Sequence, residues 1–324
     1  MIYLSKVKEA YQAVIVIYSC EPNADTTKAE GIAELYEGIG VTIDAALDDA
    51  TTKQNRKPFY AQNELLLIGA DLAKQNITPV LEYFSREEAL RPNMAIFIVD
   101  ESEQAVAKVE ENADDMVKSL EYLLTSKTEQ INYTTRVYEC DIAQGTFNGI
   151  LPVVTLEKET AKAKISGLTL YNKGVLSGAI AKDFTPLAMV LNGKARKIHM
   201  SEQLPEDVFV DCDVENISLR YTVDKNMKLQ VKVCGDVENL VLNQPLQNTT
   251  TDSEKKAVEE LKQIMQKDAA EIVKFVYDEN GLDGFSYLWW IRCYSLEKSK
   301  EMERLGKLYT SDNIQVLFNL NFGL

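Results

Sequence analysis

The sequence is poor in histidine: His199 is the single imidazole among 324 residues. One imidazole alone cannot form a histidine-rich metal site, and its segment KIHM contains nothing typical of a catalytic triad. We therefore interpret His199 as an ordinary residue of a strand or loop.

Motifs for phosphate binding and for hydrolase nucleophiles are also missing, since the chain contains no Walker motif, no GxGxxG and no GxSxG. The pair Gly38 and Gly40 lacks the third glycine of a phosphate-binding loop, so we interpret it as a turn. Residues 278–284 (DENGLDG) resemble a calcium loop, but Leu282 occupies a ligand position and Trp289 stands where the last glutamate belongs. We interpret that segment as a helix end followed by a turn. The sequence thus predicts no catalytic, cofactor-binding or metal-binding residues and no cofactor.

The cysteines fit neither the usual zinc pattern nor the thioredoxin pattern, because their number is odd and no CxxC occurs. They are Cys20, Cys140, Cys212, Cys234 and Cys293. We expect a buried free thiol at each position. A disulfide between Cys212 and Cys234 is an open alternative.

Positive charge is scarce, with 35 Lys and Arg against 50 Asp and Glu and a formal net charge of −15. Such a surface repels phosphate backbones, so we expect no nucleic-acid partner. Adsorption to anionic lipids through a polybasic patch is equally disfavoured. If the protein sits at a membrane, a covalent anchor or another protein must hold it there.

No apolar run approaches the roughly 20 residues of a membrane span, so we expect the chain as it stands to be soluble. The run 13–18, which follows Lys6 and Lys8 and precedes Cys20, imitates a lipoprotein signal. It is too short for a secretory core, and Tyr18 stands where small residues belong. We interpret it as a buried strand.

The chain contains enough apolar residues to form several cores, because 45% of its residues are hydrophobic and 26% are charged. Its length favours two or three domains. In the first half, strand and helix patterns alternate, and Thr78 with Pro79 forms a helix start with Thr78 as the N-cap. The expected strands are 13–18, 64–69 and 94–99, and the expected helices are 41–50, 71–75, one from Thr78, and one or two within 105–124.

The second half contains two hairpin patterns and one long amphipathic helix. Alternation on both sides of residues 172–174 (NKG) predicts a hairpin with a positive φ at Gly174. A second hairpin turns at Lys225-Asn226, and the helix from Thr251 ends at Gly281 in a left-handed cap. A helix near 184–191 and a last strand over 314–322 complete this half.

We place a boundary in the charged stretch after residue 156. The predicted domains are an N-terminal α+β domain (1–157), a small middle α+β domain (158–212) and a C-terminal α+β domain with the long helix (213–324). The fold class is α+β, with three consecutive domains of mixed or antiparallel sheets and packed helices, and not a doubly wound parallel sheet.

Two features are candidates for function, each with an ordinary explanation beside it. Acidic pairs could serve a glycosidase, but they lie in charged and solvated stretches. Examples are Asp48/Asp49, Glu87/Glu88, Glu110/Glu111 and Asp114/Asp115. Trp289-Trp290, flanked by Leu288 and Ile291, fits core packing, and an exposed anchor for a partner is the alternative.

Three stretches of the first half resemble a known family in their order and spacing. They match that family's glycine turn and helix, its strand that ends in glycine, and the helix that precedes its RD segment. The stretches are 36–46 (YEGIGVTIDAA), 58–69 (PFYAQNELLLIG) and 77–86 (ITPVLEYFSR).

The second half continues the resemblance. Residues 165–171 (ISGLTLY), with Lys173 and 176–178 (LSG), are similar to the family's "sGlavF…klvG" hairpin. The long helix from Thr251 leads to a Gly-Phe step at 284–285 and then to the terminal strand. The chain is therefore identified as similar to the Ger(x)C family of spore germination proteins, the C subunits of nutrient germinant receptors.

The resemblance implies a three-domain lipoprotein on the outer face of the spore's inner membrane. It would act without catalysis, together with an integral-membrane subunit and a larger third subunit. Precursors in the family carry a signal peptide and a lipid-modified cysteine ahead of the first domain. We expect this chain to lack both and to begin inside the family's first strand region, as a truncated or divergent member.

Two other functions are kept as alternatives. One is a soluble protein that binds a small ligand in an interdomain cleft. The other, with less support, is a hydrolase that uses paired carboxylates.

Overall fold

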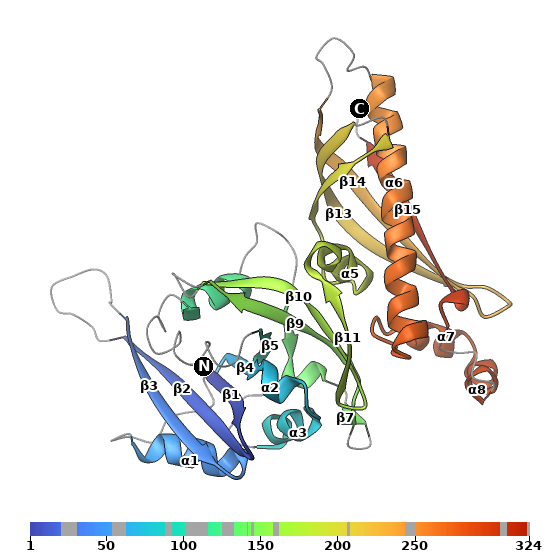
Figure 1. The fold of residues 1–324 in the computed structure, drawn as a ribbon. Coiled ribbons are helices and arrows are strands. Elements are labelled where there is room, and N and C mark those ends of the chain that lie inside the picture. Colours follow the sequence, from blue (N-terminus) through green and yellow to red (C-terminus); the bar gives the residue numbers. More distant parts are fainter. Residues whose placement is uncertain are drawn as a thin grey trace. The chain divides into compact units, whose positions relative to one another are not determined.

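The computed structural model describes residues 1–20, 31–53, 63–87, 93–100, 116–124, 133–140, 142–143, 146–157, 162–205, 208–243, 251–304 and 310–322. The chain forms two compact units (Figure 1). Unit 1 comprises Met1–Thr125 and Thr134–Ala179, and unit 2 comprises Ser126–Tyr133 and Ile180–Leu324. Both units combine strands with helices, so the predicted α+β class is confirmed.

Unit 1 is built around one mixed sheet with the strand order β11-β10-β9-β5-β4-β1-β2-β3. Its strands are β1 (Ile2–Val7), β2 (Ala10–Cys20), β3 (Gly31–Gly40), β4 (Leu65–Gly69), β5 (Ala95–Val99), β9 (Gly149–Leu156), β10 (Ala163–Asn172) and β11 (Val175–Ala181). The short β6 (Thr135–Arg136) pairs with β5, and β7 (Ile142–Ala143) pairs with β8 (Thr146–Phe147). The helices are α1 (Ile43–Thr52), α2 (Ala70–Ala73), α3 (Thr78–Arg86), a 3₁₀ turn at Val137–Glu139 and the helical residues 116–124.

The centre of this sheet is parallel, because β1, β4, β5 and β9 run in one direction. The outer pairs β1/β2, β2/β3 and β9/β10 are antiparallel. The sheet is therefore mixed, as predicted. Its parallel centre was not predicted, because the pairing of strands far apart in sequence leaves no local pattern.

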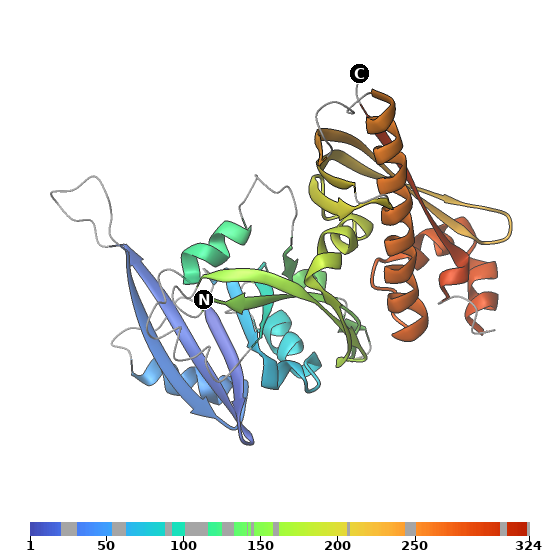
Figure 2. The same cartoon turned by 45° about the horizontal axis from the view of Figure 1, so that its top comes forward.

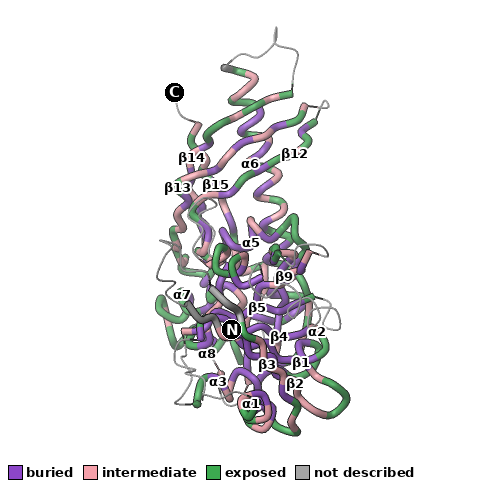
Figure 3. The backbone as a smooth tube through the Cα atoms, turned by 90° about the vertical axis from the view of Figure 1, so that its left-hand side faces the viewer, coloured by how far each residue is buried: buried purple, intermediate pink, exposed green. Residues whose placement is uncertain are grey.

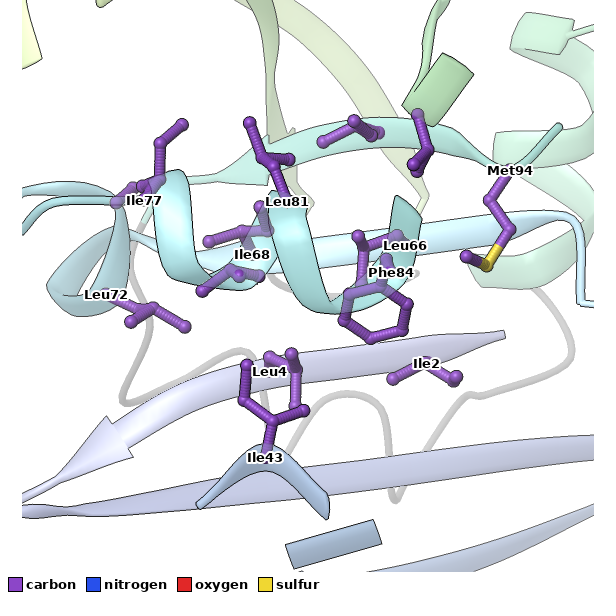
Figure 4. Packing of buried hydrophobic residues seen from close by; sticks show 14 of the residues in the cluster. Ile2, Leu4, Ile43, Leu66, Ile68, Leu72, Ile77, Leu81, Phe84 and Met94 are labelled. Carbon is purple, nitrogen blue, oxygen red and sulfur yellow. The ribbon is translucent and has the colours of Figure 1, made fainter. Parts of the chain in front are cut away.

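Alternating side chains supply a core on each face of the sheet. On one face, Leu4, Leu66 and Ile68 lie with Leu81 and Phe84 of α3 (Figure 4). On the other face, Tyr3, Leu67 and Phe97 pack with residues of the helix 116–124, among which Met116 and Leu120 are fully buried. A sheet covered on both faces requires nearly continuous apolar strands, and LLLIG and AIFIV of β4 and β5 satisfy this requirement.

The predicted turn at Gly38 and Gly40 is wrong, because both glycines lie in strand β3. A Cβ at Gly38 would overlap the backbone oxygen of Ala46 and the backbone nitrogen of Ala50, both in α1. The glycines thus allow α1 to lie directly on the strand, which a larger residue would prevent. The predicted helix after them is confirmed as α1.

The predicted N-cap role of Thr78 is also wrong, since Ile77 is the N-cap of α3. The Thr78 hydroxyl instead accepts a hydrogen bond from the Phe147 amide at 3.2 Å. The Ile77 amide donates to the carbonyl of Gly174 at 2.9 Å, and the Gly174 amide donates to Phe147 at 2.7 Å. The start of α3 is therefore held by the turn of a hairpin almost 100 residues later.

That hairpin is the predicted one, β10 and β11, joined at Lys173 and Gly174 with φ values of 54° and 78°. Two positive φ values in succession are typical of a two-residue type I′ turn. A Cβ at Gly174 would overlap the side chains of Asn76 and Thr78, so glycine is required here for space as well as for conformation.

The predicted boundary near residue 157 falls between β9 and β10, which pair in antiparallel fashion within the sheet of unit 1. Residues 158–212 are shared between the two units, with β10 and most of β11 in unit 1 and the remainder in unit 2. The division into three folding domains stays a prediction.

Unit 2 contains a four-stranded sheet in the order β12-β13-β14-β15. The strands are β12 (Ile198–Gln203), β13 (Phe209–Val223), β14 (Leu229–Leu242) and β15 (Ile314–Phe322). The helices are α5 (Thr185–Leu191), α6 (Thr251–Lys274), α7 (Tyr287–Tyr294) and α8 (Leu296–Arg304), with 3₁₀ turns at Lys182–Phe184 and Ser311–Asn313 and a π-helical turn at Phe275–Glu279. The hairpin β13/β14, the long helix and the last strand agree with the sequence analysis.

One face of this sheet is covered and the other is open. Helix α6 runs along the sheet and packs against β15 (Figures 1 and 2). Along β12–β15 buried and exposed residues alternate, whereas β4 and β5 are buried throughout (Figure 3). The helical segment that α6 and the π-helical turn form together ends as predicted, with Gly281 at φ 57° and the Leu282 amide donating to the carbonyl of Val276.

Candidate interaction surface

The segment between α6 and α7 is organised by one partly buried carboxylate, Asp283. Its Oδ1 accepts hydrogen bonds from the Tyr277 hydroxyl at 2.5 Å and the Tyr287 amide at 2.8 Å. Its Oδ2 accepts from the Leu288 amide at 3.2 Å. Asp283 thus satisfies two free amides at the start of α7, a role that a capping residue usually has. Burial raises the pKa of Asp283 above its ordinary value.

This arrangement confirms that residues 278–284 are a helix end and a turn. Asp278, the other carboxylate that begins the segment, accepts from the amide and the hydroxyl of Ser311 at 2.7 and 2.6 Å. Both carboxylates therefore hold protein groups. Within the part of the chain that the structure describes, no cluster of three His, Cys, Asp or Glu residues could hold a metal ion.

Helix α7 packs against a group of aromatic rings. Tyr287 is fully buried, donates to the carbonyl of Leu191 at 2.8 Å, and lies 6.0 Å from the ring of Tyr277. Tyr221 of β13 lies 5.9 Å from Tyr287 and stacks on Trp290 at 4.5 Å with an interplanar angle of 17°. The buried side of α7 therefore fixes the direction of its exposed side.

The exposed side of α7 carries Trp289, Trp290 and Tyr294, and the exposed Leu296 begins α8. We call these four side chains the aromatic surface. Their exposed fractions are 57%, 37%, 51% and 55%. The expectation of core packing is therefore wrong for the two tryptophans, although their neighbours Leu288 and Ile291 are buried. The apolar neighbours in the sequence suggested burial of both tryptophans, but a short helix at the surface buries only one of its sides.

Helix α7 lies near the C-terminal end of α6 and contacts α8 (Figures 1 and 2). Basic side chains accompany it: Arg292 forms an exposed ion pair with Glu303 at 3.6 Å, and Lys298 donates to the carbonyl of Lys225. A compact exposed set of tryptophan, tyrosine and leucine marks an interaction site more often than chance placement does.

The open face of the same sheet carries a polar cluster around Asp213. Lys197 lies 2.9 Å from Asp213 and 2.6 Å from Glu215, and Asn239 donates to Asp213 at 2.9 Å. These partners, led by Asn239 and followed by Lys197, lower the pKa of Asp213 to about 2. Hydrogen bonds to Glu215 and Asp213 raise the pKa of Lys197.

His199 belongs to this cluster, with Nδ1 3.1 Å from Asp213 and Nε2 3.4 Å from Asp211. It lies in β12 and its side chain is exposed, as expected for an ordinary strand residue. The cluster links the three neighbouring strands β12, β13 and β14 across their exposed face, which explains it as sheet stabilisation.

Strand β15 forms one edge of this sheet. Among the described residues it pairs only with β14, in parallel and without a register shift from Ile314 to Phe322. Its nine residues, IQVLFNLNF, include no charge and no proline. Natural edge strands are usually protected by charge, proline or a bulge, and the opposite edge β12 carries His199 and Glu202. The β15 edge thus offers backbone hydrogen-bonding groups to a further strand.

The cysteine predictions are confirmed in part. Cys140 and Cys212 are buried free thiols, and burial raises the pKa of Cys212 to about 12. Cys234 is also free and half-buried, so no disulfide joins it to Cys212. The prediction of burial is wrong for Cys293, which is exposed on α7. The side-chain environment of Cys20 lies outside the described residues.

The acidic pairs are not brought together at any described cleft. Asp48 and Asp49 lie on α1, where Asp49 accepts from the Ile39 amide at 3.0 Å. Residues 110–111 and 114–115, and Glu88 of the pair at 87–88, fall outside the described residues.

Comparison with known proteins gives two findings. A family model described as spore germination protein N-terminal domain matches residues 5–156. The crystal structure of the GerBC protein is similar, with a TM-score of 0.59 and 14% sequence identity over 99% of this chain and 96% of that chain. At that identity the likeness shows the fold alone. No curated protein matches the chain.

Across the described residues, the helices are all too short or too polar to span a bilayer.

Proposed function

We propose that this chain, which belongs to the Ger(x)C family of spore germination proteins, is the C subunit of a nutrient germinant receptor and acts by contact rather than by catalysis. The observation that carries the proposal is the match of residues 5–156 to the spore germination N-terminal domain. The likeness of the fold to the GerBC protein supports it over nearly the whole chain.

A role without catalysis is supported by the way the described polar groups are used. Asp283 caps a helix and Asp213 holds Lys197 and Asn239. A catalytic acid or base must be able to reach a substrate, and these groups are already bound to protein partners. Their perturbed pKa values are explained by burial and by local ion pairs.

The proposed partners are an integral-membrane subunit and a larger third subunit, with a lipid anchor that holds the precursor at the outer face of the spore's inner membrane. The β15 edge is the contact that we assign to a partner subunit, through an extended uncharged segment that adds a strand. Backbone hydrogen bonds would supply affinity in this mode, and the alternating side chains would supply selectivity.

The first experiment deletes the gene and follows release of the spore core's calcium chelate across a panel of nutrients. Loss of the response to one nutrient class, restored by complementation, supports the receptor role. Paralogous receptors are deleted as well to exclude redundancy. An unchanged response in that background would remove the receptor role and leave the ligand-binding alternative.

The contact mechanism is tested in the complemented strain with Asn319→Lys on β15. Lysine on an edge strand opposes strand addition, so we expect slower germination at an unchanged protein level. Ser201→Lys on β12 is the matched control, since it places the same charge on the other edge of the sheet. If Asn319→Lys spores respond as the control spores do, the β15 contact is wrong, whatever the deletion shows.

A further inference from the structure

We propose that the aromatic surface of α7 and α8 lies in the lipid–water interface of an anionic bilayer, with Trp289, Trp290 and Tyr294 at the level of the head groups. The inference rests on the proposed function, because the lipid anchor proposed there would bring the surface to the bilayer, where four side chains that bind lipid only weakly by themselves would stay inserted.

The residue types of the aromatic surface are those enriched at the interface between a membrane and water. Indole and phenol rings combine an apolar body with a polar tip, and they concentrate where hydrocarbon meets water. Trp289, Tyr294 and Leu296 are each more than half exposed. The other exposed large apolar side chains are more scattered in the sequence, and their closest pair is Ile39 and Val41. The aromatic surface differs because four such side chains lie within eight residues.

The charge of this segment differs from that of the whole chain. Residues 285–304 contain four basic and three acidic side chains, whereas the chain carries a net charge of −15. Arg292 is the charged residue of α7 itself, and no acidic residue lies in that helix. An anionic lipid surface attracts each nearby Lys or Arg by about 1 kcal/mol. The segment that carries the aromatic surface therefore does not share the strong negative charge of the whole chain.

The size of the surface favours lipid over a protein partner. A stable protein interface buries about 800 Å² on each partner and involves roughly 20–30 residues. The aromatic surface consists of four apolar side chains on a short helix and its junction with the next. A bilayer interface adapts its shape and needs no complementary pocket, so a small set of rings is sufficient there.

The surface is also prepared for insertion. Tyr221 stacks on Trp290, and Asp283 fixes the start of α7, so the rings are held outward before any contact. Insertion therefore does not require refolding, which would oppose binding.

The experiment uses the fact that the chain has two tryptophans, both in the aromatic surface. The chain is mixed with vesicles of phosphatidylcholine and phosphatidylglycerol (7:3), and tryptophan emission is recorded. Insertion should shift the emission to shorter wavelength and make it sensitive to quenching by bromine on the lipid chains near the head groups. Pure phosphatidylcholine and added salt should weaken both effects.

Cosedimentation with the same vesicles tests the residues directly. Replacing both Trp289 and Trp290 by Ala should lower the partition coefficient roughly tenfold, equivalent to about 1.4 kcal/mol. Tyr138→Ala removes an exposed ring of unit 1 and should change nothing. Circular dichroism of each variant checks that the fold is kept.

Three outcomes are decisive. Lipid quenching of the wild-type emission, together with cosedimentation that falls in the double tryptophan variant, supports the inference. Absence of a shift and of quenching at millimolar lipid overturns it, as does an emission shift that requires a partner subunit and not lipid. The germination assay separates this result from the proposed function, because a deletion phenotype with no lipid binding rejects the lipid contact alone. Lipid binding without a deletion phenotype rejects the receptor role alone.

Discussion

The two larger sheets among the described residues are used in different ways. In unit 1, helices cover both faces, and every residue of β4 and β5 is buried. In unit 2, buried and more exposed residues alternate along β13 and β14. One side of these strands lies in the core, and the other carries polar groups such as Asp213 and Asp236. A sheet covered on both sides is specified by packing alone, whereas a sheet with one open face keeps residues available for other tasks.

The region that matches the family and the surfaces that we expect to contact partners also lie in different units. The family match, residues 5–156, lies almost entirely in unit 1. The aromatic surface and the β15 edge lie in unit 2. A packed core constrains many positions at once, so it gives a recognisable sequence even where it touches no partner.

The largest effect is expected in unit 1 from Gly38→Ala, because the new Cβ would overlap backbone atoms of α1. We expect a loss of at least about 4 kcal/mol in the free energy of unfolding. Both tryptophans are in unit 2, so tryptophan fluorescence follows that unit while far-ultraviolet circular dichroism follows both. The circular dichroism transition should move to lower urea, and the fluorescence transition should stay.

Gly193→Ala in unit 2 is the matched control. Its Cβ would meet Leu219 Cδ1 at 3.6 Å, which is ordinary contact, and the cost is limited to a positive φ of 69°. We expect about 1 kcal/mol. Equal losses for the two glycines would contradict the view that unit 1 is limited by packing.

The next effect is expected from Asp283→Ala in unit 2. The change leaves the Tyr277 hydroxyl and the amides of Tyr287 and Leu288 without their acceptor, which should cost about 2–3 kcal/mol. Urea unfolding followed by tryptophan fluorescence measures it. Asp183→Ala, which removes an exposed carboxylate, should change the midpoint little, and similar midpoints for the two variants would refute the capping role.

A smaller effect concerns pH and the open face. The pKa of Asp213 is held at about 2, below the ordinary value, so its stabilising contribution is complete above pH 4 and is lost as pH falls towards 2. Compared with Asp213→Asn, the wild type should be more stable by about 1 kcal/mol at pH 6, since partial exposure weakens the ion pair. This difference should shrink between pH 4 and pH 2 in urea titrations. A constant difference would show that charge is not the cause.

The smallest effect on stability is expected from Trp289→Ala, at most about 0.5 kcal/mol, because the side chain is 57% exposed. Trp290→Ala should cost about 1 kcal/mol, since it also loses the stacking on Tyr221. Thermal unfolding by circular dichroism compares them. If Trp289→Ala destabilised the protein as strongly as Asp283→Ala does, the ring would be part of the core and not of a surface.

Local chemistry made several elements predictable from the sequence. Alternating residues on both sides of Lys225-Asn226 predicted the β13/β14 hairpin. Glycine predicted the turn at Gly174 and the helix end at Gly281. The apolar stripe of α6 gave the longest helix. In each case the deciding interaction joins residues close in sequence.

The errors came from contacts between distant residues. Gly38 serves the approach of a helix and not a turn, and the hydroxyl of Thr78 binds Phe147 and not its own helix. The parallel pairing of β14 with β15 joins strands about 70 residues apart. The exposure of Trp289 depends on which side of α7 faces β13. None of these contacts leaves a periodic signal in the sequence.

The turn at Gly174 has a consequence for synthesis on the ribosome. Residues 76–78 are made early, yet their hydrogen-bonding partners at residues 147 and 174 are made much later. Until β10 and β11 have left the exit tunnel, the start of α3 lacks its partners and β9 lacks its neighbour β10. A nascent chain that stops at residue 156 therefore contains the whole family signature and still cannot complete its first unit. Chaperones would meet it in that state, and pauses in translation before residue 179 would prolong it.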